Sequence, residues 1–177
     1  MKTGSFQEKL LIAKLRMRDK EAFAQLYDNY IDRIYRFIYF KVSNKETAED
    51  LTSQTFLKVW QYALDGNIKL GKSLQAFLYT AARNTVIDYY RQNKNKEISL
   101  DESEDISVEN NIEQSIDQDL QVDEVSKKLK NLKNEYQEII ILYYINELSI
   151  KEIASVLNKK KGTIRVTLHR ALKALRK

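Results

Sequence analysis

The sequence of 177 residues contains no cysteine and no proline, and it has only four glycines and one histidine. Without cysteine the chain can form neither disulfides nor thiolate metal sites. The single histidine, His169, cannot build a cluster of metal ligands by itself. The lack of proline and the scarcity of glycine favour helices joined by polar turns. We therefore expect an all-α protein with no metal site and no cofactor.

Long apolar stretches are also missing from the sequence. The longest apolar run, from Ile139 to Ile145, is far too short to cross a bilayer. The N-terminus does not show a basic region followed by an apolar run and a cleavage site. We expect no membrane insertion and a cytoplasmic location.

Charge is distributed unevenly although the net charge is only +5. Acidic residues concentrate between Glu97 and Glu124, where no Lys or Arg occurs, whereas the stretch from Lys159 to Lys177 is basic and has no acid. Such segregation suggests that one surface meets a polyanion. A solvated basic helix beside a disordered acidic loop is the alternative.

Apolar residues recur at helical spacing in two blocks of the chain. In the first block we expect a helix from about Asp19 to Val42, a turn at Ser43-Asn44-Lys45, a second helix with Ala48 to Tyr62 on its apolar face, and a third helix after Ser73, with Asp19 and Ser73 as N-caps. From Asn93 to about Asp119 the pattern fails, because the segment is polar, charged and poor in large apolar groups. The predicted organisation is a domain at 1–95, an acidic flexible linker at 96–119 and a second domain at 120–177. The linker could span roughly 90 Å when fully extended.

The second block contains the clearest local signal in the chain. Ser149-Ile150-Lys151-Glu152 is a capping box that predicts a helix start, and Leu148 can pack onto Ile153. Asn158 is a suitable left-handed residue to end this short helix. A final basic helix begins near Gly162. Together these elements, Ile150 to Lys173, predict a helix-turn-helix.

In a helix-turn-helix the N-terminal turns of the second helix contact base edges in the major groove. Arginine can bridge two acceptors on guanine, a methyl group can meet thymine, and Lys and Thr suit phosphates. The residues that we expect these turns to expose are Lys161, Thr163, Arg165, Val166, Thr167 and Arg170. A generic helical hairpin with a solvated basic face is the alternative interpretation.

The third predicted helix also has a polar face. Asn84, Asp88 and Arg91 line up at helical spacing, and Arg83 and Tyr89 add charge and aromatic surface. Cations follow a nucleic-acid backbone, aromatic rings stack on unpaired bases, and Asn or Asp can read a base edge. The alternative is that Asp88 and Arg91 are only an exposed ion pair.

Three stretches of the chain resemble the extracytoplasmic-function (ECF) sigma factors of the sigma-70 class. The first runs from Ala48-Glu49-Asp50-Leu51 through Phe56-Leu57-Lys58-Val59-Trp60 and resembles the helix that binds the β′ clamp of RNA polymerase. The second runs from Phe77-Leu78-Tyr79 through Ala82-Arg83-Asn84 to Ile87-Asp88-Tyr89-Tyr90-Arg91 and resembles the helix that opens and reads the −10 element. The third runs from Leu148-Ser149 through Glu152-Ile153-Ala154 to Leu168-His169-Arg170-Ala171 and resembles the −35 reader.

The resemblance implies two small helical domains, a sigma-2-like bundle and a sigma-4-like helix-turn-helix. It implies binding to core RNA polymerase, at the β′ clamp and the β flap, and to promoter DNA in duplex and single-stranded form. It also implies a separate anti-sigma factor as a partner. The predicted polymerase-binding residues are Asp50, Gln54, Phe56 and Trp60; Trp60 is equally well explained as a core residue. The predicted −10 residues are Arg83, Asn84, Asp88, Tyr89 and Arg91, and the −35 residues are those named above.

The chain departs from the family pattern at several positions. Gln54 stands where Glu is usual, and Lys159 and Lys160 stand where an apolar residue and a Ser-like cap are common. Thr167 occupies a common arginine position. Because of these departures, the −35 sequence that the chain would read stays open, whereas the expected role as a −35 reader is unaffected.

Two other classes of function each explain part of the sequence. A stand-alone helix-turn-helix regulator would leave the first domain unexplained, and an RNA-binding protein would leave the helix-turn-helix unexplained. The sequence offers no catalytic residues, because it has no glycine-rich phosphate loop and its carboxylates concentrate in the predicted linker. We therefore do not expect an enzyme.

Overall fold

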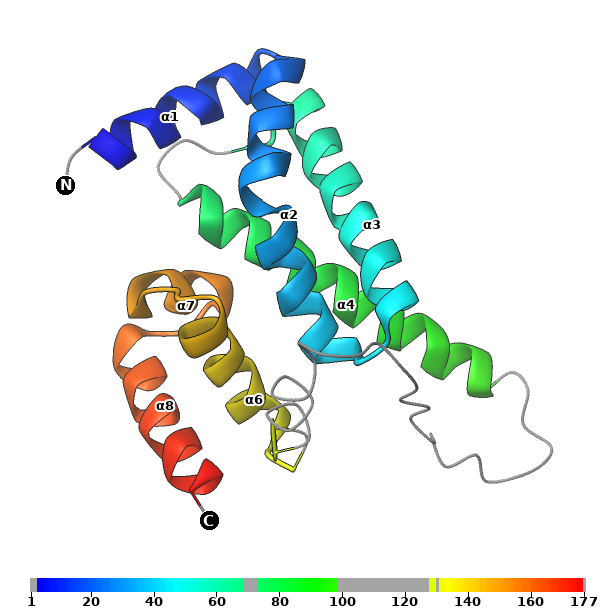
Figure 1. Cartoon of the computed structure of the whole chain (residues 1–177), viewed down its shortest axis with the longest axis vertical. Coiled ribbons are helices and arrows are strands. Elements are labelled where there is room, and N and C mark those ends of the chain that lie inside the picture. Colours follow the sequence, from blue (N-terminus) through cyan, green and yellow to red (C-terminus); the bar gives the residue numbers. More distant parts are fainter. Residues whose placement is uncertain (1–2, 69–72, 99–127, 130, 177) are drawn as a thin grey trace, which may run out of the picture.

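The computed structural model describes residues 3–68, 73–98, 128–129 and 131–176. Within these ranges all regular secondary structure is helical (Figure 1), so the predicted all-α class is confirmed. The N-terminal block contains α1 (Thr3–Arg16), α2 (Lys20–Val42), α3 (Lys45–Leu64) and α4 (Leu74–Ile98). The C-terminal block contains α6 (Asn134–Ile140), the π-helical turn η1 (Ile141–Ile145), α7 (Ile150–Val156) and α8 (Lys161–Leu175). Most of the predicted linker lies outside the described residues.

Polar side chains cap the helices of the N-terminal block. The Asp19 carboxylate accepts a hydrogen bond from the Ala22 N–H at 3.0 Å, and the Ser73 hydroxyl accepts one from Ala76 at 3.4 Å. Both predicted caps are therefore confirmed. Between α2 and α3, Ser43 adopts a left-handed conformation with φ of 54°, and the Asn44 side chain caps α3 through the Thr47 N–H at 2.8 Å. These contacts satisfy backbone groups that the ends of helices leave unpaired.

The core of the N-terminal block lies where α2, α3 and α4 pack on one another. Leu26, Phe37, Val59 and Leu78 are among its fully buried residues. Helix α1 was not predicted from the sequence, yet it buries Ile12 and Leu15 against this core. It packs on α2 and α3, and it lies at the end of the block that is remote from α8 (Figure 1).

Helix α4 is longer than the sequence pattern suggested. We expected helical structure to fail at Asn93, but the helix continues to Ile98. The extension contains two lysines and a glutamate, which have good intrinsic helix propensity. Loss of the apolar stripe at Asn93 therefore did not mark the end of the helix.

The C-terminal block begins its helix-turn-helix as predicted. The Ser149 hydroxyl accepts the Glu152 N–H at 3.3 Å, and the Glu152 carboxylate accepts the Ser149 N–H at 2.9 Å, which completes the capping box. Leu148 and Ile153 are buried beside it. Asn158 is left-handed with φ of 51°, as predicted. The expected helix to Ile145 is α-helical only to Ile140 and then forms the π-helical turn.

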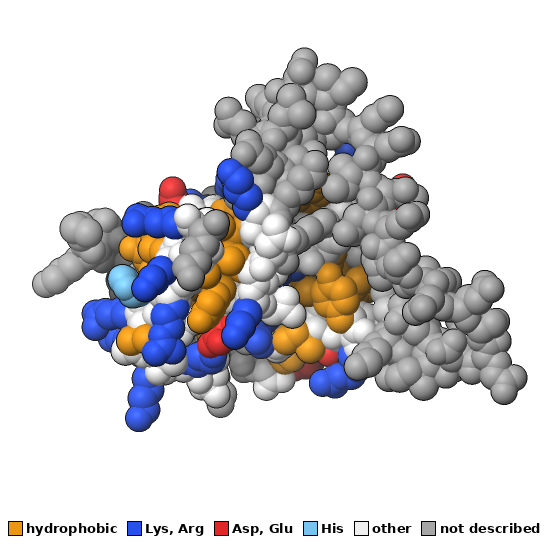
Figure 2. All heavy atoms as spheres, turned by 90° about the horizontal axis from the view of Figure 1, so that it is seen from below, with side chains coloured by type: hydrophobic (Ala, Val, Ile, Leu, Met, Phe, Trp, Pro, Cys, Tyr) orange, Lys and Arg blue, Asp and Glu red, His pale blue; other side chains and the backbone are white. Residues whose placement is uncertain are grey.

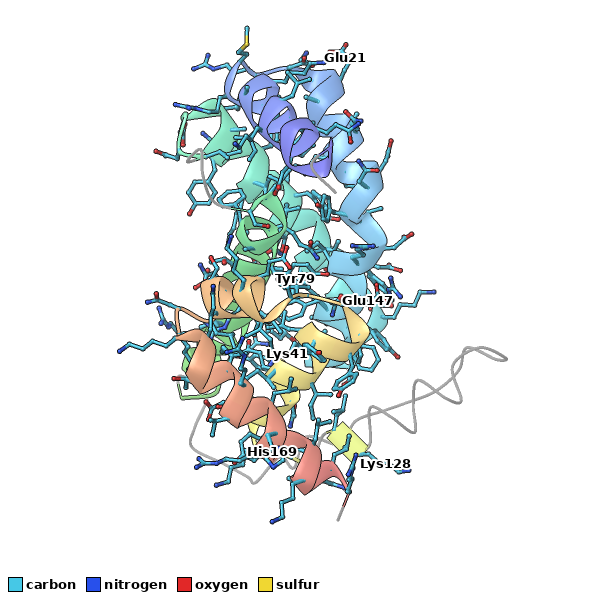
Figure 3. All side chains as sticks on the ribbon, turned by 90° about the vertical axis from the view of Figure 1, so that its left-hand side faces the viewer. Glu21, Lys41, Tyr79, Lys128, Glu147 and His169 are labelled. Carbon is cyan, nitrogen blue, oxygen red and sulfur yellow. The ribbon has the colours of Figure 1, made fainter. Side chains whose placement is uncertain are left out.

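The two blocks are in contact in this structure. Helix α4 packs on α7, and α2 packs on η1. Figure 3 shows Lys41 and Tyr79 near the level at which the blocks meet, with Glu21 and His169 toward opposite ends. Among the described helices, none combines the length and apolar character needed to span a membrane.

Candidate nucleic-acid interface

Helix α8 separates an inward apolar face from an outward basic face. Ile164 and Ala171 are fully buried, whereas Lys161, Arg165 and Arg170 are exposed. Figure 2 shows Lys and Arg side chains gathered around the single histidine on this part of the surface. The remaining exposed predicted residues are Thr163 and Val166, and the Val166 side chain is 51% exposed. A basic helix with an exposed methyl-bearing residue is suited to the major groove.

The start of α8 favours a phosphate. Lys160 occupies the N-cap position and provides no side-chain hydrogen bond to the helix. The first turn therefore keeps backbone N–H groups available for an anion, at the positive end of the helix dipole. Lys159 pairs with Glu135 of α6 within the same block. The unusual lysines at 159 and 160 thus leave the turn intact and add charge beside it.

One predicted −35 residue is placed differently from the expectation. Thr167 is only 8% exposed, so the prediction that it lies on the outward face is wrong. It follows Ile164 by three positions and precedes Ala171 by four, which puts all three on the inward face. Thr167 supports the helix and is not available to touch a base.

The polar face of α4 borders a cavity of about 730 Å³ between α4 and α3. Asn84, Asp88 and Arg91 line it from α4, and Lys58 and Tyr62 line it from α3. Asp88 pairs with Lys58 at 3.1 Å, with both side chains nearly half exposed. A solvent-exposed pair of this kind contributes little stability. The structure therefore brings three predicted −10 residues together beside a space that is lined by amide, carboxylate, guanidinium and phenol groups.

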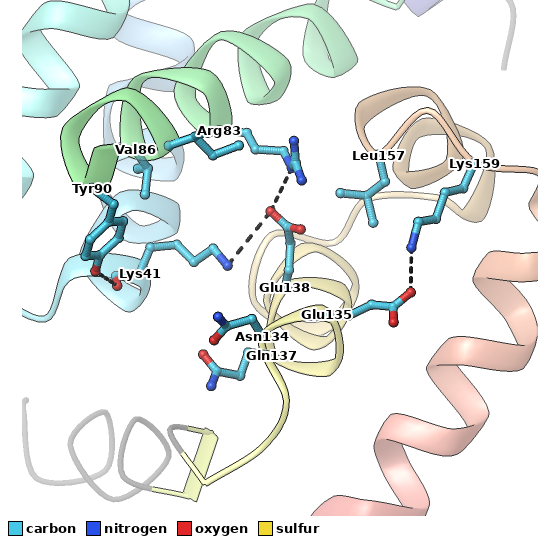
Figure 4. Close-up of a pocket in the computed structure, with 11 residues that line it drawn as sticks. Lys41, Arg83, Val86, Tyr90, Asn134, Glu135, Gln137, Glu138, Leu157 and Lys159 are labelled. Atoms are coloured by element: carbon cyan, nitrogen blue, oxygen red, sulfur yellow. Dashed lines mark hydrogen bonds and ion pairs between the residues drawn. The ribbon is translucent and has the colours of Figure 1, made fainter. Parts of the chain in front are cut away.

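The other two predicted −10 residues lie away from this cavity. Arg83 projects from a different face of α4 and its Nε donates a hydrogen bond to Glu138 of α6 at 3.0 Å (Figure 4). Tyr89 is partly buried, and its ring centroid lies 5.4 Å from that of Tyr90. The Tyr90 hydroxyl in turn donates to the Lys41 carbonyl at 2.8 Å.

A stripe of exposed residues follows α3 on the predicted polymerase-binding side. Asp50, Gln54 and Leu57 share one helical face and are all exposed. Leu57 is 68% exposed and was not among the predicted contacts. An exposed leucine inside a polar helical face was the sequence signal that could have identified it.

The two aromatic residues predicted on this surface are placed in or near the core. Phe56 is 3% exposed and its ring lies 4.8 Å from that of Tyr27, so it cannot present a contact surface directly. Trp60 is partly buried, with its ring 4.8 Å from that of Phe23. This contact supports the core interpretation of Trp60, and its role toward polymerase stays a prediction. Among the described residues, no group of three or more His, Cys, Asp or Glu side chains is placed to hold a metal ion.

Two family models match the chain on either side of the predicted linker. The model for sigma-70 region 2 matches residues 26–96, which include α3 and the polar face of α4. The model for sigma-70 region 4 matches residues 123–175, which include the helix-turn-helix.

Relatives of known function are similar over nearly the whole chain. The RNA polymerase sigma factor YlaC of Bacillus subtilis is 31% identical over 166 residues, which cover 91% of this chain and 94% of YlaC. The chain belongs to the ECF sigma factors of the sigma-70 class. The ECF sigma factor BldN of Streptomyces coelicolor is 34% identical over 167 residues, 93% of this chain, which spans 63% of the length of BldN.

The fold of this ECF sigma factor is also similar to solved structures. The sigma factor RpoE of Bartonella quintana, determined in complex with the anti-sigma factor NepR, matches with a TM-score of 0.69 and 27% identity. The match covers 86% of this chain and 93% of RpoE. The resemblance inferred from the sequence is therefore confirmed.

Proposed function

We propose that this ECF sigma factor directs RNA polymerase to promoters by reading a −35 duplex with α8 and by holding unpaired −10 bases beside α4. The proposal rests on the outward basic face of α8. This helix follows α7, which begins with a complete capping box and is joined to α8 by a left-handed turn at Asn158. Arg165 and Arg170 are the proposed base readers. Lys161, Thr163 and the first-turn N–H groups are placed to bind phosphates.

The cavity between α3 and α4 is the proposed site for unpaired −10 bases. Its Asn84 and Asp88 side chains offer base-edge contacts, Tyr62 offers a ring for stacking, and Arg91 offers a charge for the backbone. Capturing an unpaired base offsets the cost of unstacking it. Tyr89 is partly buried and does not line this cavity.

The exposed stripe Asp50, Gln54 and Leu57 is the proposed surface for core polymerase at the β′ clamp. Phe56 supports this stripe from the core. We include an anti-sigma factor among the proposed partners, because RpoE of Bartonella quintana was determined with one. Contact with the β flap is proposed for the C-terminal block on the family resemblance alone.

We expect the purified chain to bind core polymerase more tightly than it binds promoter duplex alone. Gln54→Ala and Leu57→Ala should each weaken core binding, because they remove contacts from the exposed face of α3. Lys45→Ala, at the start of the same helix and outside the stripe, is the control. The measurement is core-polymerase affinity, followed by run-off transcription on genomic fragments. Tight sequence-specific duplex binding without affinity for core polymerase would favour a stand-alone regulator.

We expect Asn84→Ala and Asp88→Ala to impair strand opening more than initial duplex binding. Base contacts and stacking are worth about 1–3 kcal/mol per base, so each variant should lower the open fraction about tenfold. Permanganate footprinting on linear templates at low temperature reports unpaired thymines directly. Asn29→Ala removes an exposed amide from α2 and serves as the control. Normal strand opening in both α4 variants would show that Asn84 and Asp88 are ordinary surface residues of a helix.

A further inference from the structure

The contact between the two blocks uses charged and polar residues that ordinary helix packing does not require. Lys41, Tyr79 and Arg83 approach it from the N-terminal block, and Glu138 and Asn146 approach it from the C-terminal block. Figure 4 shows Glu138 between Lys41 and Arg83. One of these residues, Arg83, is also a predicted −10 contact.

Glu138 binds the Arg83 guanidinium through the kind of contact that a DNA phosphate would make. Its Oε1 accepts a hydrogen bond from Arg83 Nε at 3.0 Å and lies 3.8 Å from Lys41 Nζ. The Glu138 side chain is only 12% exposed, so solvent screens the pair weakly. Burial lowers the pKa of Lys41 below its ordinary value, and Glu138 opposes this effect. Guanidinium binds carboxylate and phosphate through the same charge-assisted hydrogen bonds.

A second buried contact fixes how the blocks are placed. The Tyr79 hydroxyl donates to Asn146 Oδ1 at 2.9 Å, and Asn146 Nδ2 donates to the Ile141 carbonyl at 3.0 Å. Tyr79 is fully buried and Asn146 is 3% exposed. Leaving either group unpaired in the interior would be unfavourable, so the pair specifies this arrangement over others.

An open pocket of about 620 Å³ lies beside these contacts. It is found between α4 and α6, next to Glu138, with Val86, Tyr90 and Leu157 in its lining. The buried apolar residues of the two blocks belong to one cluster, so apolar packing holds the blocks together and the polar pairs select this particular arrangement.

The observed arrangement cannot read a whole promoter. The −10 and −35 elements lie about 25 base pairs apart, which is roughly 85 Å along B-form DNA at about 3.4 Å per base pair. Here α4 packs directly on α7, and α8 is a helix of 15 residues, about 22 Å long. Both readers cannot reach their elements at once while the blocks stay in contact.

We propose that the contact is an autoinhibitory latch, in which Glu138 takes the place of a DNA phosphate on Arg83 and the Tyr79–Asn146 pair fixes the closed state. The inference rests on the proposed function, since it assigns the closed state to the free protein and the open state to promoter binding. Opening releases Arg83 for the −10 strand and frees α8 to reach the −35 element.

The test uses the full chain carrying two labels. Because the sequence has no cysteine, Ser53→Cys on α3 and Ser155→Cys on α7 introduce unique label sites, both on exposed residues. Glu138→Gln removes the charge that holds Arg83 while keeping the side-chain size. Glu135→Gln is the matched control, because Glu135 lies one turn earlier on α6 and pairs with Lys159 inside its own block. Tyr79→Phe removes only the second contact.

We expect one short distance between the labels in the native protein and in Glu135→Gln. Glu138→Gln should add a population at longer distance, and Glu138→Gln with Tyr79→Phe should enlarge it. The affinity of the free protein for a single-stranded −10 oligonucleotide should rise about 3- to 10-fold as this longer-distance population grows, because apparent affinity scales with the open fraction. Adding Arg83→Ala should remove this gain. Circular dichroism checks that the helices of each variant are retained.

Unchanged distance and unchanged oligonucleotide affinity in the Glu138→Gln, Tyr79→Phe double variant would overturn the latch. Run-off transcription by the native chain with core polymerase tests the proposed function independently. Promoter-specific transcripts combined with unaltered distances would reject the latch and keep the function. Lengthened distances in the variants without any promoter-specific transcript from the native chain would reject the proposed function. The contact between the blocks would then stand as a conformational contact with no role in promoter recognition.

Discussion

Promoters that depend on a −35 element should lose activity when Arg165 or Arg170 is changed to alanine. Both side chains are exposed on the outward face of α8, whose inward face is fixed by buried Ile164 and Ala171. A lost bidentate contact to guanine typically costs about 1–3 kcal/mol, which is about 5- to 150-fold in binding. We expect the two effects to add to about 2–6 kcal/mol if the arginines contact separate bases.

The measurement compares transcription from promoters with an intact and with a mutated −35 element. The losses should appear only on the intact element, and core-polymerase affinity should not change. Lys173→Ala removes a positive charge from the last turn of the same helix and is the matched control. Loss of a charge that does not read a base weakens binding to all sequences alike, so any effect of Lys173→Ala should be the same on both elements. Equal losses on intact and mutated elements in the arginine variants would show that α8 supplies charge and not sequence readout.

Local signals in the sequence were sufficient to predict much of the fold. Asp19, Ser73 and Ser149 each cap a helix as expected, because a cap depends on residues within one turn of it. The apolar periodicity of α2, α3 and α4 predicted the core of the N-terminal block. The helix-turn-helix could be predicted in the same way, since its capping box and its left-handed Asn158 are properties of a few neighbouring residues.

Features that depend on tertiary packing were predicted less well. Among the side chains of α1 from residue 7 to 16, which the structure describes, Ile12 and Leu15 are the deeply buried ones, so the apolar signal of this helix was short. Phe56 and Thr167 were assigned to surfaces by motif position, but packing places both in the interior. The π-helical turn directly precedes Asn146, whose side chain accepts a hydrogen bond from Tyr79, 67 residues away, and no local pattern in the sequence indicates either feature.

The contact between Arg83 and Glu138 had no sequence signal at all. The residues are 55 positions apart, and the chain offers 30 basic and 25 acidic side chains that could pair. Charge complementarity alone cannot choose among so many partners. The choice is made by the packing of α4 on α7 and of α2 on η1, which places Glu138 between Arg83 and Lys41.

Phe37→Ala should produce the largest loss of stability among single changes in the N-terminal core. Phe37 is fully buried, and its ring meets that of Tyr79 edge-on with centroids 5.4 Å apart. Truncating a buried phenylalanine costs about 3–5 kcal/mol, a large part of the 5–15 kcal/mol that stabilises a typical domain. With a urea dependence of about 2 kcal/mol per molar, the unfolding midpoint should fall by roughly 2 M.

The single tryptophan makes this prediction straightforward to measure. Trp60 packs on Phe23 in the N-terminal block, so its fluorescence reports unfolding of that block, while far-UV circular dichroism reports helices of both blocks. Leu57→Ala is the control, because its 68% exposed side chain should change stability by about 0.5 kcal/mol or less. A Phe37→Ala variant within about 1 kcal/mol of the native protein would mean that the α2–α4 core can collapse around the vacated ring. In that case Tyr79 would lose the rigid support that directs its hydroxyl toward Asn146.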